Sequence, residues 1–126
     1  MKIRWTRGSV RFRITPTELE SLQRGDSVEE HLSLPGGLAW RAVLFPVQES
    51  ASRLRFDSQA LSLALAAADL ARLGDPSAEG VYFVEGDLRY FIEKDFPCIH
   101  PRPVEAQETT ETFAPPAGFA DRHRPC

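Results

Sequence analysis

One pattern occurs twice along this chain, and it constrains the possible fold more than any other feature of the sequence. Each copy has two short segments of alternating apolar and polar residues, a short amphipathic helix that ends at a glycine, and two further strands. The copies span residues 2–45 and 53–94. Because hairpin, helix and glycine stop recur in one register, the sequence predicts an internal duplication.

The equivalent apolar positions define this alignment. In the first hairpin of each copy, the matched pairs are Ile3 with Leu54, Trp5 with Phe56, Val10 with Leu61, Phe12 with Leu63 and Ile14 with Leu65. After the helices, Leu38, Trp40 and Ala42 are matched with Leu88, Tyr90 and Ile92. Each copy has one apolar face to bury, so we expect the two copies to pack or close on one another.

Capping and turn residues set the predicted boundaries. The run Thr15-Pro16-Thr17-Glu18 favours a helix start, and Gly25 favours its end. Pro35-Gly36-Gly37 and Gly86-Asp87 indicate turns between strands. The predicted fold is a single α+β domain over residues 1–94, in which duplicated ββαββ halves form an antiparallel eight-stranded sandwich or barrel with two short helices.

Composition allows one soluble domain and excludes several classes of protein. Of the 126 residues, 42% are hydrophobic and 26% are charged, which is ordinary for a globular chain. The net charge of −3 gives no basis for bulk affinity for nucleic acid. The start carries no secretory signal, and no window approaches the roughly 18 apolar residues of a membrane span. We therefore expect a cytoplasmic protein that binds neither membranes nor nucleic acid.

Eight cationic side chains alternate with the apolar positions of the predicted strands. They are Lys2, Arg4, Arg11, Arg13, Arg41, Arg53, Arg55 and Arg89. In the first hairpin we expect Arg4 opposite Arg11 and Lys2 opposite Arg13, and such pairs of like charge are unfavourable. A bound polyanion would offset the repulsion, and so would salt or nearby carboxylates such as Glu93. A polyanion-binding surface and a solvated outer face therefore both remain open.

Residues 95–126 are predicted to form an extended arm. This segment holds six of the ten prolines, and its stretch 105–112 has too little apolar content to fold alone. Phe96, Phe113 and Phe119 are spaced like anchors. We expect them to bind a protein partner or a second copy of the chain, or to pack back on the domain. The alternative is a disordered tail with incidental aromatic residues.

Cys98, His100, His123 and Cys126 are the candidate thiol or metal ligands. Their spacing matches no familiar zinc motif, so free thiols are the first expectation, a Cys98–Cys126 disulfide or redox pair the second, and a metal site the third. Cys98 and His100 have no evident third residue to orient them, so nucleophilic catalysis is not predicted. No cofactor is predicted.

Two resemblances accompany these patterns. The duplicated strand–helix–strand order resembles the triphosphate-tunnel fold, but the glutamate-x-glutamate-x-lysine signature of that family is absent near the N-terminus, so metal-dependent phosphate hydrolysis is not expected. Lys2-Ile3-Arg4, the run 9–15 and the run 93–98 resemble a family of short uncharacterised bacterial proteins that also end in a cysteine, like Cys126. This second resemblance implies no activity.

The function that the sequence predicts is non-enzymatic. We expect a small binding or accessory protein that acts through its C-terminal arm and its sheet surface. One alternative is a protein of triphosphate-tunnel type that binds a polyanion or a phosphorylated ligand through its basic strand faces. The other is a thiol or metal site at Cys98.

Overall fold

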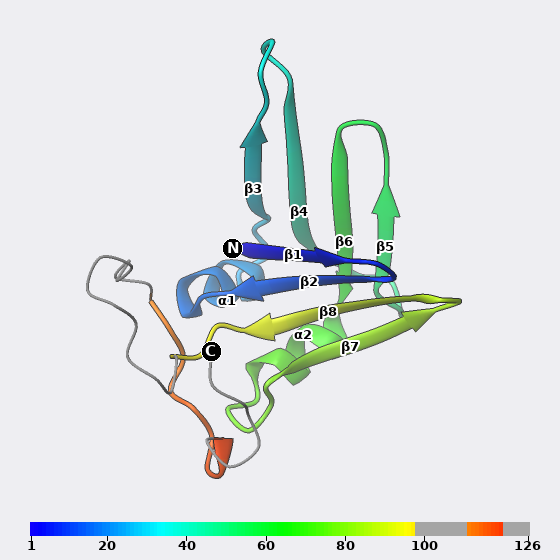
Figure 1. The fold of residues 1–126 in the computed structure, drawn as a ribbon. Helices are drawn as coiled ribbons and strands as arrows, with labels where there is room; N and C mark the ends of the chain where they lie inside the picture. The colour runs from blue at the N-terminus through cyan, green and yellow to red at the C-terminus, as the bar shows by residue number, and fades with distance from the viewer. Residues whose placement is uncertain (98–110, 120–126) are drawn as a thin grey trace, which may run out of the picture.

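The structure is a computed structural model that describes residues 1–97 and 111–119 (Figure 1). Its elements, in chain order, are β1 (Lys2–Thr6), β2 (Ser9–Ile14), α1 (Pro16–Gln23), β3 (Val28–Ser33), β4 (Ala39–Val47), β5 (Arg53–Phe56), β6 (Ala60–Ala66), α2 (Ala67–Gly74), β7 (Gly80–Glu85) and β8 (Leu88–Lys94). Within these described residues, two helices and eight strands confirm the predicted α+β class. The start of α1 after Thr15 and the strand turns at 35–37 and 86–87 lie where the sequence predicts them.

Helix α1 begins and ends for the reasons that the sequence indicates. The Thr15 side chain accepts a hydrogen bond from the backbone N–H of Glu18, and Pro16 occupies the first turn. Gly25 follows the helix with a φ of 93°, a left-handed conformation that favours glycine. The Glu18 carboxylate accepts from the Met1 ammonium at 2.7 Å and from the Thr15 hydroxyl at 3.1 Å.

The strands form two separate four-stranded sheets. Sheet A has the order β1-β2-β8-β7, and sheet B has the order β3-β4-β6-β5. The central pairs β2–β8 and β4–β6 are parallel, whereas the outer pairs are antiparallel. The expected all-antiparallel arrangement and the closed barrel are therefore wrong. Strands β2 and β8, like β4 and β6, lie far enough apart in sequence for the long crossover that parallel pairing requires.

The two sheets have matching topologies. Counted from its β5 edge, sheet B has the order β5-β6-β4-β3. This order matches β1-β2-β8-β7 of sheet A strand by strand, with an antiparallel hairpin on each side of a central parallel pair. Phe12 is registered with Ile92, and Leu63 is registered with Leu44. If Phe12 corresponds to Leu63, Ile92 corresponds to Leu44, so the predicted match with Ala42 is displaced by two residues. A shift of two keeps every side chain on the same face, which is why the alternation of the sequence does not detect it.

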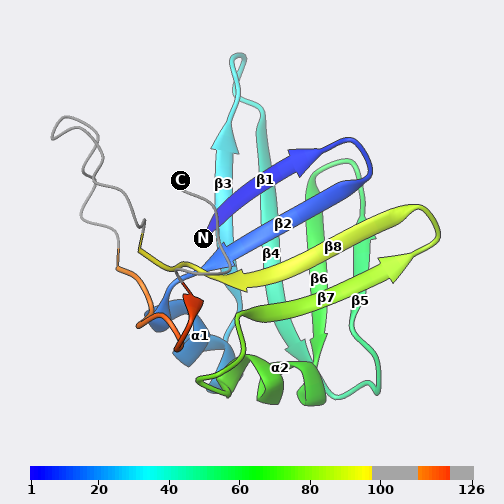
Figure 2. The same cartoon turned by 60° about the horizontal axis from the view of Figure 1, so that its bottom comes forward.

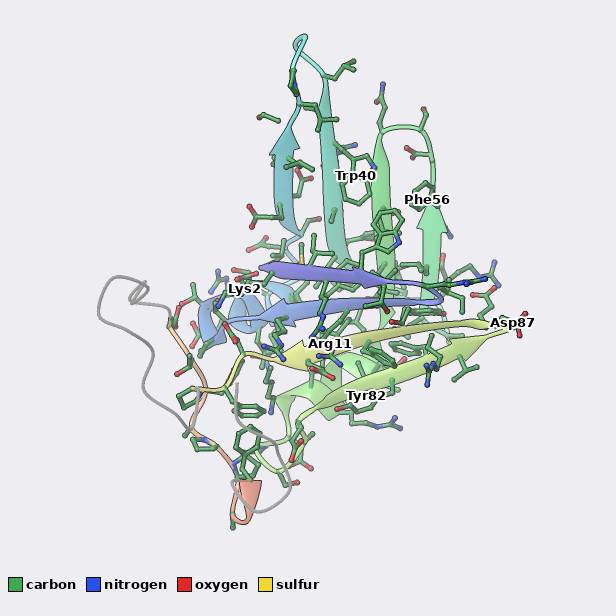
Figure 3. All side chains as sticks on the ribbon, viewed as in Figure 1. Lys2, Arg11, Trp40, Phe56, Tyr82 and Asp87 are labelled. Carbon is green, nitrogen blue, oxygen red and sulfur yellow. The ribbon has the colours of Figure 1, made fainter. Side chains whose placement is uncertain are left out.

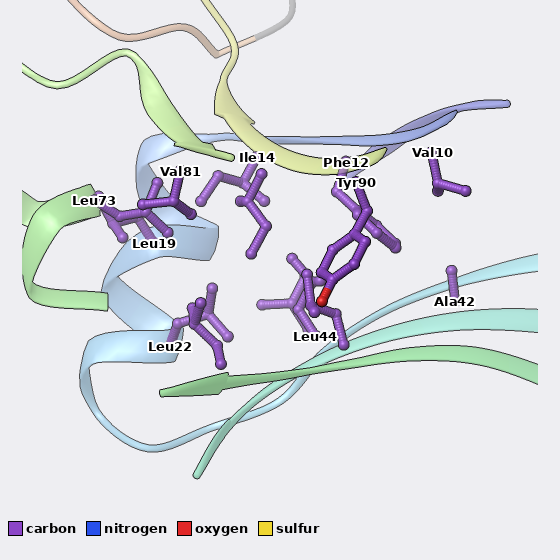
Figure 4. Packing of buried hydrophobic residues seen from close by; sticks show 14 of the residues in the cluster. Val10, Phe12, Ile14, Leu19, Leu22, Ala42, Leu44, Leu73, Val81 and Tyr90 are labelled. Carbon is purple, nitrogen blue, oxygen red and sulfur yellow. The ribbon is translucent and has the colours of Figure 1, made fainter. Parts of the chain in front are cut away.

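The core lies between the two sheets and is closed at one end by the helices. Fully buried side chains include Phe12 and Ile92 from sheet A, Leu44 and Leu63 from sheet B, and Leu22 from α1 (Figure 4). Helix α1 packs on β3 and β4, and α2 packs on β6 and β7. Figure 2 shows both helices side by side at one end of the sheets, away from the β1–β2 and β7–β8 turns.

The chain leaves sheet A where the sequence predicts, since β8 ends at Lys94. The described part of the arm then lies against the domain. The backbone N–H of Phe113 donates to the Asp95 carbonyl at 2.9 Å. The Thr17 hydroxyl donates to the Glu111 carboxylate at 2.8 Å. Most of the polar stretch 105–112 lies outside the described residues.

Replacing Phe12 with alanine is expected to lower the free energy of unfolding by about 3–5 kcal/mol, because this fully buried ring leaves a cavity between the sheets. Urea denaturation followed by far-UV circular dichroism measures the change. Leu38→Ala is the control, since Leu38 is 66% exposed, and we expect a change within about 0.5 kcal/mol. Similar losses in the two variants would contradict the described core.

Candidate functional site

A cleft of about 520 Å³ opens between the turn end of sheet A and the β5–β6 edge of sheet B. Strands from both sheets contribute to its wall. The lining residues are Trp5, Thr6, Gly8, Ser9 and Val10 from the β1–β2 hairpin, Leu54, Arg55, Phe56 and Leu61 from β5 and β6, and Glu85 and Leu88 beside the β7–β8 turn. The wall is mainly apolar, and Arg55 and Glu85 are its charged members.

Three aromatic side chains gather at the mouth of this cleft, which we call the aromatic cleft. The ring centroids of Trp5 and Trp40 are 5.9 Å apart, those of Trp5 and Phe56 6.1 Å, and those of Trp40 and Phe56 6.4 Å. Trp5 is 61% exposed and Phe56 is 63% exposed. Figure 3 shows Trp40 and Phe56 beyond the β1 edge of sheet A.

The sequence placed these three aromatic residues on the apolar faces of their strands but did not predict their exposure. The exposed apolar surface continues along the β3–β4 hairpin, where Leu32 is registered with Trp40 and both Leu32 and Leu38 are exposed. Contiguous apolar surface of this kind marks a binding site more often than isolated exposed residues do. The available signal was the length of β4, which has nine residues. Figure 1 shows that this strand continues past the strands of sheet A.

A buried tyrosine links the two sheets beside the aromatic cleft. The Tyr90 hydroxyl lies 3.5 Å from the Glu85 carboxylate and also interacts with the backbone of Leu54 in sheet B. Its ring stacks on Phe83 with centroids 5.0 Å apart. Burial, and next the charge of Glu85, raise the pKa of the Tyr90 phenol above its ordinary value. The hydroxyl therefore keeps its proton at neutral pH and donates to Glu85.

The eight predicted basic residues fall on two different surfaces. Lys2, Arg4, Arg11, Arg13 and Arg89 lie on the outer face of sheet A, opposite its buried side chains. Arg41, Arg53 and Arg55 belong to sheet B, and they alternate with inward-facing residues there. The predicted opposition of Arg4 to Arg11 and of Lys2 to Arg13 is confirmed by the register. No single surface collects all eight of these described residues.

Carboxylates offset part of the repulsion on the outer face of sheet A. Glu93 lies 3.4 Å from Arg11 and 3.9 Å from Arg13. The Lys2 ammonium donates to Asp95 at 3.0 Å. Among residues 1–97 and 111–119, Arg4 and Arg89 have no ion pair of this kind.

Of the three phenylalanines that were predicted as anchors, Phe96 lies against both of the others. The Phe96 ring lies 6.1 Å from that of Phe113 and 4.7 Å from that of Phe119. The Lys94 ammonium lies 5.5 Å from the Phe113 ring and donates to the Asp75 carbonyl at 2.7 Å. Burial lowers the pKa of Lys94, because it disfavours the charged form. These contacts place the described part of the arm against its own domain, and docking on a partner stays a prediction.

The candidate thiol and metal ligands Cys98, His100, His123 and Cys126 lie outside the described residues. Within residues 1–97 and 111–119, no three histidine, cysteine, aspartate or glutamate side chains gather as a metal site would require. In the same part of the chain, no helix has the length and apolar character needed to cross a membrane.

Ionisation of the two tyrosines tests the contact beside the aromatic cleft. The pKa values of Tyr82 and Tyr90 are both raised above 10.0, in each case mainly by burial. At a pH between the unfolded-state pKa and the folded-state pKa, the phenol therefore keeps its proton in the folded chain and has lost it in the unfolded chain. This stabilisation is present below about pH 10 and is lost as the pH rises through the folded-state pKa.

In a Tyr82→Phe background, we expect Glu85→Gln to lower the pKa of Tyr90, because the substitution removes a nearby negative charge. Tyrosinate absorbance during an alkaline titration of the folded protein measures this value. An unchanged midpoint would show that Glu85 does not act on this phenol. Asp87→Asn, on the same turn, is the matched control.

Comparison with known protein families places this chain in a family. The model of a family of unknown function, DUF7009, matches residues 1–117. No curated protein and no solved structure gives a significant match. The match covers the whole of both sheets and agrees with the resemblance to an uncharacterised family. The chain therefore belongs to the DUF7009 family of unknown function.

Proposed function

We propose that this protein is a non-enzymatic binding protein whose aromatic cleft holds a small apolar molecule. The observation that carries the proposal is the exposure of Trp5 and Phe56, which are more than 60% accessible although they lie on the inward faces of their strands. Leaving two large rings in water costs free energy that a bound apolar molecule would recover. The volume of about 520 Å³ suits a small ligand.

The wall of the aromatic cleft indicates the chemistry of the ligand. Trp5, Phe56 and the leucines of the wall fit an aromatic or branched aliphatic body. Of the two charged residues of the wall, Glu85 is on the inward face of β7 with Phe83, whereas Arg55 alternates with the inward-facing Leu54 and Phe56. The Glu85 carboxylate therefore favours a ligand that carries a hydrogen-bond donor or a positive charge. The nearby rings favour a cation further, because the face of an aromatic ring attracts positive charge.

Two finer interpretations remain proposals beside this one. The matching strand orders of sheets A and B support an internal duplication of the ββαββ unit. The arm is proposed to contact a protein partner or a second copy of the chain, in addition to its contacts with the domain. Of these surfaces the aromatic cleft has the strongest support, because its rings are exposed while Phe96, Phe113 and Phe119 are half-buried.

The cleft has a built-in reporter, because Trp5 lines it and Trp40, the other tryptophan of the chain, lies against Trp5. Titration with the apolar dye N-phenyl-1-naphthylamine is expected to quench tryptophan emission and to raise dye emission saturably. Phe56→Ala is expected to weaken binding by about tenfold or more, which corresponds to the loss of one buried phenylalanine ring. Tyr82→Ala, which removes an exposed ring from the outer face of sheet A, is the control. Equal affinity in Phe56→Ala and the wild type would refute the proposal.

The charge preference has its own test. We expect benzyltrimethylammonium to bind more tightly than a neutral ligand of the same shape, and Glu85→Gln to remove that difference. Isothermal titration calorimetry measures both affinities. If Glu85→Gln weakens the neutral ligand equally, the carboxylate acts on the shape of the cleft and not on ligand charge.

A further inference from the structure

The outer face of sheet A carries a row of side chains that crosses all four strands. Arg4 in β1 is registered with Arg11 in β2, Arg11 with Phe91 in β8, and Phe91 with Tyr82 in β7. Residues registered in this way share one face of the sheet. The row therefore runs from two guanidinium groups at one edge to two aromatic rings at the other.

Further cations flank this row. Lys2 and Arg13 are registered on one side of it, and Arg89 lies on the other side beside Ser9. Glu93 and Asp95 neutralise part of the charge. The Nε of Arg11 is buried and lies 3.4 Å from the Glu93 carboxylate, so Arg4 and Arg89 are the exposed cations of this face without an ion pair among residues 1–97 and 111–119. This basic face has charge available for an anion with several negative groups.

The aromatic end of the row is open to solvent. Tyr82 is 56% exposed on an edge strand, and Val84, on the same face of β7, is 74% exposed. The Tyr82 and Phe91 rings are 5.5 Å apart, and the Arg11 guanidinium lies 5.9 Å from the Phe91 ring. Figure 3 shows Arg11 and Tyr82 over sheet A, on different strands from Trp40 and Phe56 of the aromatic cleft.

We propose that this basic–aromatic face binds single-stranded nucleic acid. Arg4, Arg13 and Arg89 contact phosphates, and unpaired bases stack on Tyr82 and Phe91. A simple polyanion would use the cations and leave the rings exposed, whereas a single strand presents phosphates and flat apolar bases together. Bases in a duplex are stacked on each other and are not free to lie on a sheet surface. The expectation that nucleic acid is not bound came from the net charge, which does not describe this one face.

Fluorescence anisotropy of labelled single-stranded DNA and RNA oligonucleotides tests this proposal with the full chain. We expect saturable binding at about 50 mM salt that weakens strongly by about 200 mM, because phosphate contacts release counterions. The double variant Arg4→Ser, Arg89→Ser is expected to reduce the slope of log K against log salt by about 0.7 for each lost phosphate contact. Both positions are exposed, so the fold is expected to be retained.

Substitutions of Tyr82 separate the contribution of base stacking to the affinity from the contribution of charge. Tyr82→Ala is expected to weaken binding by about fivefold to a hundredfold with an unchanged salt slope, and Tyr82→Phe is expected to retain the affinity. Arg41→Ser with Arg53→Ser is the matched control on sheet B and is expected to have no effect. Phe56→Ala, at the aromatic cleft, is also expected to leave oligonucleotide binding unchanged.

Three results would overturn the proposal. One is the absence of binding at the lowest salt. Another is binding of heparin or triphosphate at equal affinity with no effect of Tyr82→Ala, which would make the face a general polyanion surface. The third is tighter binding of duplex than of single strands. Thermal unfolding of each variant, compared with the wild type, ensures that lost binding reflects the altered face and not a lost fold.

Discussion

The parallel pairings at the centre of each sheet hold this molecule together. Strand β2 from the first half lies beside β8 from the second, and β4 lies beside β6 in the same way. Each sheet therefore contains one hairpin from each half, and neither half is able to complete a four-stranded sheet alone. The buried pairs at these seams, Phe12 with Ile92 and Leu63 with Leu44, are fully inaccessible. Each half therefore buries its central strand against a strand of the other half.

Because each sheet combines a hairpin from each half of the chain, the strand arrangement also determines which part of the space between the sheets is accessible to solvent. The helices close one end of the space between the sheets, but the hairpin turns lie at the other end, and β4 continues past the strands of sheet A. The alternation that buries Phe12 in β2 therefore leaves Trp5 exposed in β1, since no strand lies opposite to cover it completely. Trp5, Trp40 and Phe56 shield one another only in part. The aromatic cleft is thus a consequence of the strand arrangement rather than of any local motif.

The sequence predicts where helices and strands begin and end, because these boundaries depend on interactions between residues that are close together in the chain. Thr15 and Gly25 bound α1 through hydrogen bonding and backbone geometry that depend on neighbouring residues alone. Proline at position 97 and the polar segment after it predict the end of β8 in the same way. Parallel pairing is different, because it depends on which distant strand lies alongside, and alternation with a period of two fits parallel and antiparallel partners equally.

The dependence of strand pairing on distant parts of the chain also explains which site residues the sequence predicts. The opposition of Arg4 to Arg11 follows from one short hairpin and was predicted correctly. The aromatic continuation of that row was not, because Phe91 and Tyr82 join it only through the pairing of β2 with β8. Exposure of Trp5 and Phe56 was missed for a related reason. An apolar residue on an inward face is predicted to be buried unless the extent of the opposite sheet is known.

Net charge is a poor guide to what one face of this protein is able to bind, because electrostatic interactions in salt are local. The chain carries a net charge of −3, yet Arg4, Arg13 and Arg89 share one face of one sheet. At physiological salt the Debye length is about 8 Å, so acidic residues on the far side of the domain are largely screened from an anion at this face. What such an anion meets is the registered row and its acidic neighbours, which include Glu93, Asp95 and Glu79, the last of which acts on Tyr82. The charge that such an anion meets therefore depends on which side chains the strand register brings to this face. The net charge of the chain carries no information about strand register.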